Sequence, residues 1–219
     1  YKYALSLELQ EKYSDAEKAF DQAIEYTYED KVDVIHTIAQ SFDQIGRYKT
    51  ALKYLLEAYK LDDTNIMILY DIGYCYEKLG QINRSIEFYN QYLDREPFSE
   101  NAWYNLGIIY NKNEMYDKAV EAYEFALAIN PDFSVAYFNM ANSLSNKEEY
   151  HKAIINYKEY LKFDDSSVEV ITFIGDCYEN LGEYDLALKY YDEAIAKDQY
   201  YSDSLYGKAN VMVSLDKPE

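Results

Sequence analysis

Apolar residues recur along this chain at the spacing of amphipathic helices, i, i+3, i+4 and i+7. The stretch 101–131 shows the unit most clearly. A large apolar, a small and an aromatic residue precede a short polar break, and small, aromatic and small residues then lead to a proline. These positions hold Trp103, Leu106, Gly107, Tyr110, Ala119, Tyr123, Ala126 and Pro131. Each unit therefore predicts two helices, A and B, joined by a tight turn.

The same pattern returns every 34 residues. The small residue of helix A that stands at Gly107 recurs as Ala39, Gly73, Ala141, Gly175 and Ala209. Near the start, Ala4 comes one residue early, so the first connection carries a one-residue insertion. A fixed period of this length predicts stacked repeats that pack only on their neighbours, rather than one globular core.

The apolar spacing and its breaks predict twelve paired helices and one unpaired helix. Glycines at 46, 80 and 182 fit helix C-caps. Proline, Asp and Ser between units are expected to end one helix and cap the next. No stretch predicts a strand. The expected ranges are about 1–10 and 14–28, 32–45 and 48–61, 66–79 and 82–95, 100–113 and 116–129, 134–147 and 150–163, 168–181 and 184–197, and 202–215.

The pattern resembles the tetratricopeptide repeat, whose signature residues fall at these offsets, over residues 1–215. The resemblance implies an all-α fold, a right-handed α-solenoid of antiparallel helix pairs forming a single domain over 1–219. It also implies a scaffold that binds a protein or peptide, although a fold alone does not fix function. The repeats would span about 1–31, 32–65, 66–99, 100–133, 134–167 and 168–201, followed by the lone helix.

In that family a groove is lined by slots two, five, nine and twelve of helix A, counted so that Trp103 is slot four. Asn105 and Asn139, at slot six, add amides near the rim. Ordinary variation within the family explains these residues equally well, and the outer face of the B helices is an alternative binding surface. The implied groove residues are His36, Gln40, Tyr70, Tyr74, Glu77, Tyr104, Asn105, Ile108, Asn111, Phe138, Asn139, Asn142, Thr172, Asp176, Tyr206 and Asn210.

The groove slots of the fourth and fifth repeats carry no charge, whereas the repeats on both sides carry Asp and Glu. We therefore expect a partner segment with an apolar or aromatic centre and basic flanks. Family members that clamp a C-terminal carboxylate use Lys and Arg at slots five and nine. None of those slots is basic here, so binding of an acidic tail is not expected.

The formal net charge is −19. Such a surface repels nucleic acid and anionic membranes, so neither is an expected partner. An alternative reading is that the charge simply keeps a large open surface soluble. We expect no enzyme activity, metal or cofactor, because there is no phosphate-binding glycine loop, HExxH or CxxC motif, and His36 and His151 stand in different repeats. Cys75 and Cys177 lie three repeats apart, too far for a disulfide.

Three expectations concern the core and the ends. Trp103, the only tryptophan, fits the core between helices A and B. Lys208 takes an apolar slot of the last helix, which predicts a wet outer face. The chain is expected to be a monomer or a weak dimer through its terminal helices.

The start of the chain and its hydropathy bear on its cellular location and on whether it is part of a longer protein. No secretion signal or membrane-length apolar run is present, which favours the cytoplasm. The start at Tyr1, inside a repeat, indicates an excised piece or a processed product. An alternative function is therefore a sensor or regulatory region of a larger signalling or secretion protein.

Overall fold

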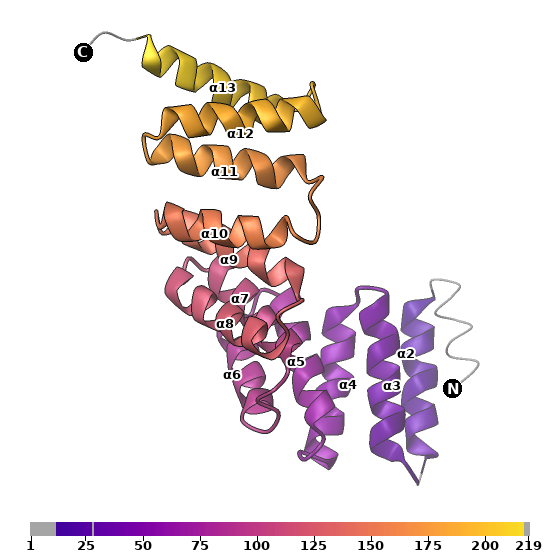
Figure 1. The fold of residues 1–219 in the computed structure, drawn as a ribbon. Coiled ribbons are helices and arrows are strands. Elements are labelled where there is room, and N and C mark those ends of the chain that lie inside the picture. Colours follow the sequence, from indigo (N-terminus) through magenta and orange to yellow (C-terminus); the bar gives the residue numbers. More distant parts are fainter. Residues whose placement is uncertain (1–11, 28, 217–219) are drawn as a thin grey trace. The chain divides into compact units, whose positions relative to one another are not determined.

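The computed structural model describes residues 12–27 and 29–216, which form helices and turns without a strand (Figure 1). The predicted helix at about 1–10 lies outside the described residues. The helices are α2 (Tyr13–Glu25), α3 (Lys31–Gln44), α4 (Tyr48–Leu61), α5 (Ile66–Lys78), α6 (Ile82–Leu93), α7 (Glu100–Lys112), α8 (Tyr116–Ile129), α9 (Ser134–Asn146), α10 (Tyr150–Tyr160), α11 (Val168–Asn180), α12 (Tyr184–Lys197) and α13 (Ser202–Leu215).

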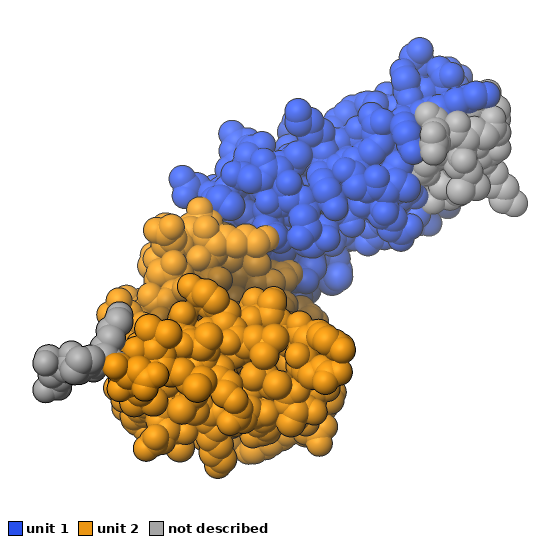
Figure 2. Space-filling model, turned by 90° about the horizontal axis from the view of Figure 1, so that it is seen from above, with its two compact units in different colours: residues 1–97 blue, residues 98–219 orange. Residues whose placement is uncertain are grey.

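The chain divides into two compact units, residues 1–97 and 98–219 (Figure 2). Within the described part of each unit, every helix packs on the next one in the chain. Unit 1 contains α2 to α6 and unit 2 contains α7 to α13. The division falls between the third and fourth repeats, and a single domain over 1–219 stays a prediction.

The predicted helix bounds agree with the observed ones within three residues, and α4, α8, α12 and α13 match at both ends. The largest differences are at the C-terminal ends of α2 and α10, which stop three residues early. In α10 the final amides, from Lys162 and Phe163, bond to carbonyls three residues back, so the last turn tightens and leaves the α-helical pattern.

The turns between helices A and B have one shared geometry. Arg47 N donates to Phe42 O and Met115 N donates to Tyr110 O, each at 2.8–2.9 Å, and this six-to-one bond is that of a Schellman C-cap. Gly46 has φ +74° there, as the sequence predicts, and Glu114 adopts φ 59° at the equivalent position. Glu114 tolerates a backbone that favours glycine because the bonds of the cap hold it.

The aspartates between repeats act differently from the prediction. Asp62 and Asp164 do not cap the helices that follow them. Asp62 Oδ1 accepts from Thr64 N at 2.9 Å, and Asp164 Oδ1 accepts from Ser166 N at 3.1 Å. These are Asx turns, in which a side chain bonds its own backbone two residues on. The caps observed from side chains among the described helices are Asn65 on α5 and Ser99 on α7.

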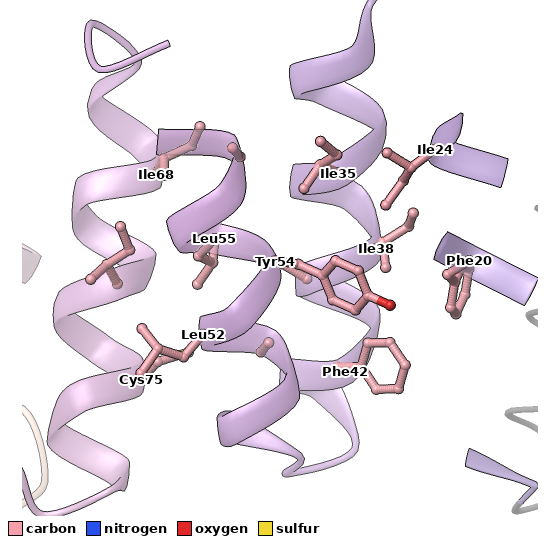
Figure 3. Packing of buried hydrophobic residues seen from close by; sticks show 14 of the residues in the cluster. Phe20, Ile24, Ile35, Ile38, Phe42, Leu52, Tyr54, Leu55, Ile68 and Cys75 are labelled. Carbon is pink, nitrogen blue, oxygen red and sulfur yellow. The ribbon is translucent and has the colours of Figure 1, made fainter. Parts of the chain in front are cut away.

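A small residue on helix A faces an aromatic ring on helix B. An ideal Cβ placed on Gly107 would lie 2.4 Å from Cε1 of Tyr123, and one on Gly175 would lie 2.7 Å from Cε1 of Tyr191. In unit 1 the buried ring of Tyr54 stacks on Phe42, with centroids 5.7 Å apart (Figure 3). The small slot therefore sets how closely each helix pair packs.

The sequence predicts that Trp103 fills the core between α7 and α8, and this prediction is wrong. Its ring is half-buried and stacks on Phe125 of α8, with centroids 4.5 Å apart, and Phe125 is itself 45% exposed. The other repeats place Gln or Glu at the position of Phe125, at residues 22, 57, 91, 159 and 193. Trp103 thus packs A against B at the surface, because this repeat alone offers it an aromatic partner.

The outer face of α13 is exposed to solvent, as predicted, but it is apolar rather than polar. Lys208 Nζ pairs with Asp192 Oδ1 of α12 at 2.6 Å, so it lies toward the preceding helix. Helix α13 packs on α12 through Ser204, Gly207 and Val211, which are buried. Its exposed residues are instead apolar, with Leu205, Tyr206, Met212, Val213 and Leu215 exposed by 44–71%.

Candidate functional site

A hollow of about 600 Å³ lies in unit 2 on the side of α7, α9 and α11 that carries the predicted groove slots. We call it the unit 2 hollow. It brings together four of the predicted site residues, Asn111, Phe138, Asn142 and Asp176. Its full lining is Asn111, Phe138, Asn142, Ser145, Asn146, Tyr157, Glu169, Phe173 and Asp176.

Two amide side chains in the hollow are oriented by their carbonyl oxygens. Asn142 Oδ1 accepts from the Tyr157 hydroxyl at 2.6 Å, and Asn111 Oδ1 accepts from Ser143 Oγ at 2.8 Å. Ser143 Oγ also lies 3.0 Å from Asn139 O, and its one hydrogen can be donated to only one of these two oxygens at a time. The NH₂ group of Asn142 has two donors and no partner among the described residues, so this residue offers a fixed set of N–H donors.

Aromatic rings form the floor beside these amides. The centroid of Phe138 lies 6.3 Å from that of Tyr157 and 6.2 Å from that of Phe173, and Tyr157 and Phe173 are 5.7 Å apart. Tyr157 belongs to the B helix α10, and its hydroxyl reaches Asn142 on α9, one residue after the small Ala141. Burial raises the pKa of Tyr157, so its hydroxyl stays a donor at neutral pH.

Helix α11 closes the hollow with acidic side chains. The Tyr191 hydroxyl lies 2.7 Å from both Asp176 Oδ1 and Glu179 Oε2. A phenol has one hydrogen and can donate to one carboxylate at a time. Burial raises the pKa of Asp176, the Tyr191 hydrogen bond lowers it, and the Glu179 and Asp203 carboxylates raise it further.

We expect Asp176→Asn to stabilise unit 2 at pH 7 by about 1 kcal/mol, the scale of one buried hydrogen bond. The folded state holds the Asp176 proton more tightly than the unfolded state, so stability falls as pH rises through the folded pKa. The gain should therefore shrink as pH falls through the folded pKa and be lost below the unfolded pKa. Urea unfolding followed by Trp103 fluorescence reports on unit 2. If Asp176→Asn were less stable than wild type at pH 7, the raised pKa of Asp176 would be contradicted. The control is Glu193→Gln, because Glu193 is exposed.

Unit 1 has a separate, smaller hollow of about 280 Å³, between α3, α4 and α5. We call it the unit 1 hollow, and it is lined by Ala39, Gln40, Asp43, Gln44, Leu55, Asp71, Tyr74 and Cys75. Gln40 and Tyr74 are predicted site residues. His36 lies beside it, with Nε2 2.6 Å from Asp71 Oδ2, and its side chain is only 12% exposed.

Other predicted site residues make structural contacts instead. Thr172 is buried, with Oγ1 2.6 Å from Ser204 Oγ on α13, so its place in the groove is corrected. Asn139 Nδ2 donates to the Tyr104 hydroxyl at 3.0 Å and to Val135 O, which ties α9 to α7.

The remaining predicted residues are divided between the units. In unit 1, Tyr70 packs edge-on against two tyrosine rings of α6, and the Glu77 side chain is only 7% exposed. In unit 2, Asn105 and Ile108 are half-buried on α7. Tyr206 is exposed and Asn210 is half-buried on α13, and neither lines the unit 2 hollow.

The sequence prediction missed Tyr157, Phe173 and Asp71. Phe173 and Asp71 occupy slot six, which the prediction used only where it held an amide. Tyr157 belongs to a B helix, and the groove was assigned to A helices alone. A signal was present in the pairing of a small residue on A with a large aromatic on B, because such a ring can extend past the small residue to the far side of helix A.

The cysteines are free and buried, and burial raises the pKa of Cys75 to about 12 and of Cys177 to about 11. Among residues 12–27 and 29–216, no three His, Cys, Asp or Glu side chains converge as metal ligands. None of the helices described has the length and apolarity needed to cross a bilayer.

Four models of the tetratricopeptide repeat match the chain, at residues 32–65 and 68–98, 100–133, 122–155, and 168–201. The matches at 32–65, 68–98, 100–133 and 168–201 follow the helix pairs described above. The chain is a tetratricopeptide repeat protein. Its helix pairs form the all-α solenoid fold of this family, whose members are generally non-enzymatic interaction scaffolds.

Solved structures share the fold of this tetratricopeptide repeat protein. A MamA crystal structure is 25% identical, covers 75% of this chain and 96% of its own, and has a TM-score of 0.70. MamA from Desulfovibrio magneticus RS-1 is 20% identical, with coverages of 80% and 99% and a TM-score of 0.73. YrrB, described as a TPR protein with an unusual peptide-binding site, is 21% identical, with coverages of 87% and 98% and a TM-score of 0.75. No curated protein sequence gave a match.

Proposed function

We propose that this tetratricopeptide repeat protein is a non-enzymatic scaffold that holds an extended segment of a partner protein in the unit 2 hollow. The observation that carries the proposal is the amide of Asn142, whose oxygen accepts from Tyr157 and whose NH₂ group has no partner among the described residues. Donors of this kind suit the carbonyl groups of an extended backbone, whatever its sequence.

The floor of the hollow favours an apolar or aromatic side chain at the centre of the segment. Phe138, Tyr157 and Phe173 meet at centroid distances of 5.7–6.3 Å, within the range of aromatic packing. Burying a large apolar side chain there would contribute about 1.5–3 kcal/mol. YrrB, a protein of the same fold that is described as having a peptide-binding site, supports this class of function.

The acidic wall favours basic residues next to that centre. Glu169 and Asp176 both line the hollow, and no Lys or Arg does. The net charge of −19 also attracts a basic segment during encounter and repels nucleic acid. An acidic segment would face two carboxylates at close range and bind poorly.

A random peptide library displayed on phage tests the proposal. We expect wild-type protein to enrich peptides with an aromatic or large aliphatic residue within a few positions of Lys or Arg. Asn142→Asp keeps the oxygen that accepts from Tyr157 but replaces the NH₂ group with a carboxylate oxygen. This variant should bind the enriched peptides about tenfold more weakly, a loss of 1.4 kcal/mol, which is the scale of one lost hydrogen bond.

The control is Asn130→Asp, which adds the same charge in a turn outside the hollow and keeps an oxygen that accepts from Asp132 N. Its peptide affinities should match those of wild type. Enrichment of acidic peptides, or equal weakening by both variants, would contradict the proposed site. Equal weakening would mean that the loss does not depend on the amide donors of the hollow.

A further inference from the structure

A buried carboxylate oxygen in unit 1 has no hydrogen-bond partner. Asp43 lies in the last turn of α3 and lines the unit 1 hollow, and its Oδ1 is buried and unpartnered among the described residues. Burial raises the pKa of Asp43, the Asp71 carboxylate raises it further, and Lys78 lowers it. A buried acceptor in this state is costly unless a donor reaches it.

The second carboxylate of the hollow, Asp71, is held in place. Its Oδ2 lies 2.6 Å from His36 Nε2 and accepts from Gln40 Nε2 at 3.3 Å. Since a carboxylate oxygen only accepts, His36 Nε2 carries the hydrogen in this pair. Asp71 is therefore oriented by protein donors, whereas Asp43 is not.

The nearest protein cation does not satisfy Asp43. Lys78 Nζ lies 4.7 Å from the centroid of the Tyr74 ring and 3.3 Å from Glu77 Oε1, and it makes no hydrogen bond to Asp43. It acts on Asp43 only through longer-range charge. The hollow thus keeps two carboxylates, two glutamines and an aromatic edge around a space of about 280 Å³.

We propose that the unit 1 hollow binds the guanidinium group of an arginine side chain from a partner protein. A guanidinium presents five N–H donors in a planar fork, which can serve Asp43 Oδ1 and the free side of Asp71 together. Gln44 adds an amide oxygen as a further acceptor. The space admits one side chain rather than a helix or a strand. This site is separate from the unit 2 hollow, so either assignment can fail without the other.

The probe is N-acetyl-arginine amide, titrated into the whole chain and followed by NMR of the side-chain amides. We expect saturable shifts of Gln40 and Gln44, with no change at Asn111 and Asn142 of unit 2. N-acetyl-citrulline amide has nearly the same shape without the charge. It should bind about tenfold more weakly, as expected when a charge-assisted hydrogen bond is lost. N-acetyl-lysine amide tests whether the fork, rather than the charge alone, is recognised, and equal binding would remove the preference for arginine.

The variant is Asp43→Asn, matched by Asp63→Asn in an exposed turn. Asp43→Asn should bind the arginine probe about tenfold more weakly while melting at or above the wild-type temperature, because it removes a poorly solvated charge. Asp63→Asn should bind as wild type does. The proposal is overturned if wild type shows no saturable shift at Gln40 and Gln44, if citrulline binds equally well, or if Asp43→Asn leaves the affinity unchanged.

Discussion

Gly107→Leu is expected to destabilise unit 2 by about 3 kcal/mol, the upper end of typical overpacking costs. Even a bare Cβ at this position would lie 2.4 Å from Cε1 and 2.6 Å from Cδ1 of Tyr123. The Tyr123 ring is fully buried and cannot swing away without opening the contact between α7 and α8. The leucine must therefore force the two helices apart.

Urea unfolding monitored by Trp103 fluorescence and circular dichroism gives the measurement. Two alanine variants separate the clash from helix propensity, since Gly→Ala favours a helix by about 1 kcal/mol. Gly73→Ala should be close to neutral, because its Cβ would lie 3.2 Å from the Tyr89 ring and a small shift relieves it. Gly107→Ala should be clearly destabilising. If Gly107→Leu were as stable as wild type, the close approach of α7 and α8 would be contradicted.

The repeat period predicts the helices well because each boundary depends on local residues. The turn at 46–47 needs positive φ, and glycine supplies it whatever lies elsewhere in the fold. The small slot at Gly107 predicts a close helix pair for the same reason. The identity of the facing group, Tyr123 rather than an alanine, depends on the rotation of helix B and was not predicted.

The candidate site is less predictable because exposure depends on the neighbouring helix. Thr172 occupies the same slot as Phe138, yet Ser204 on α13 covers it. Slot position states which side of helix A a residue faces, but not how closely the next A helix approaches. Asn139 is similar, because its amide is used by Tyr104 and is not available to a partner.

Charge pairs across repeats are the least predictable features. The bond between His36 and Asp71 joins residues 35 apart in sequence, and each alone looks like an ordinary exposed polar residue. The unpartnered Asp43 oxygen likewise depends on where the Lys78 chain settles. Such contacts follow from side-chain rotamers, which the repeat pattern does not specify.

Phe138→Ala is expected to weaken binding of a peptide enriched from the phage library by about 30-fold, or 2 kcal/mol, the scale of an interface hot spot. Phe138 packs on Tyr157, Tyr160 and Phe173 and also lines the hollow, so its removal takes away the floor that the partner would contact. Because the ring is half-buried, the same change should cost about 1–2 kcal/mol of unit 2 stability.

A matched control separates lost contact from lost stability. Phe133 is also half-buried, packs on Tyr104 with centroids 4.9 Å apart, and lies outside the hollow. Phe133→Ala should lower the stability of unit 2 by a similar amount. Its effect on peptide affinity should nevertheless be small, because Phe133 does not line the hollow.

Calorimetric titration of that peptide into wild type, Phe138→Ala and Phe133→Ala at 25 °C tests the binding surface most directly. With the peptide centred on the unit 2 hollow, Phe138→Ala binds about 30-fold more weakly and Phe133→Ala stays within about twofold of wild type. Equal affinities for all three proteins, or equal losses in the two variants, would place the partner on another surface of the molecule.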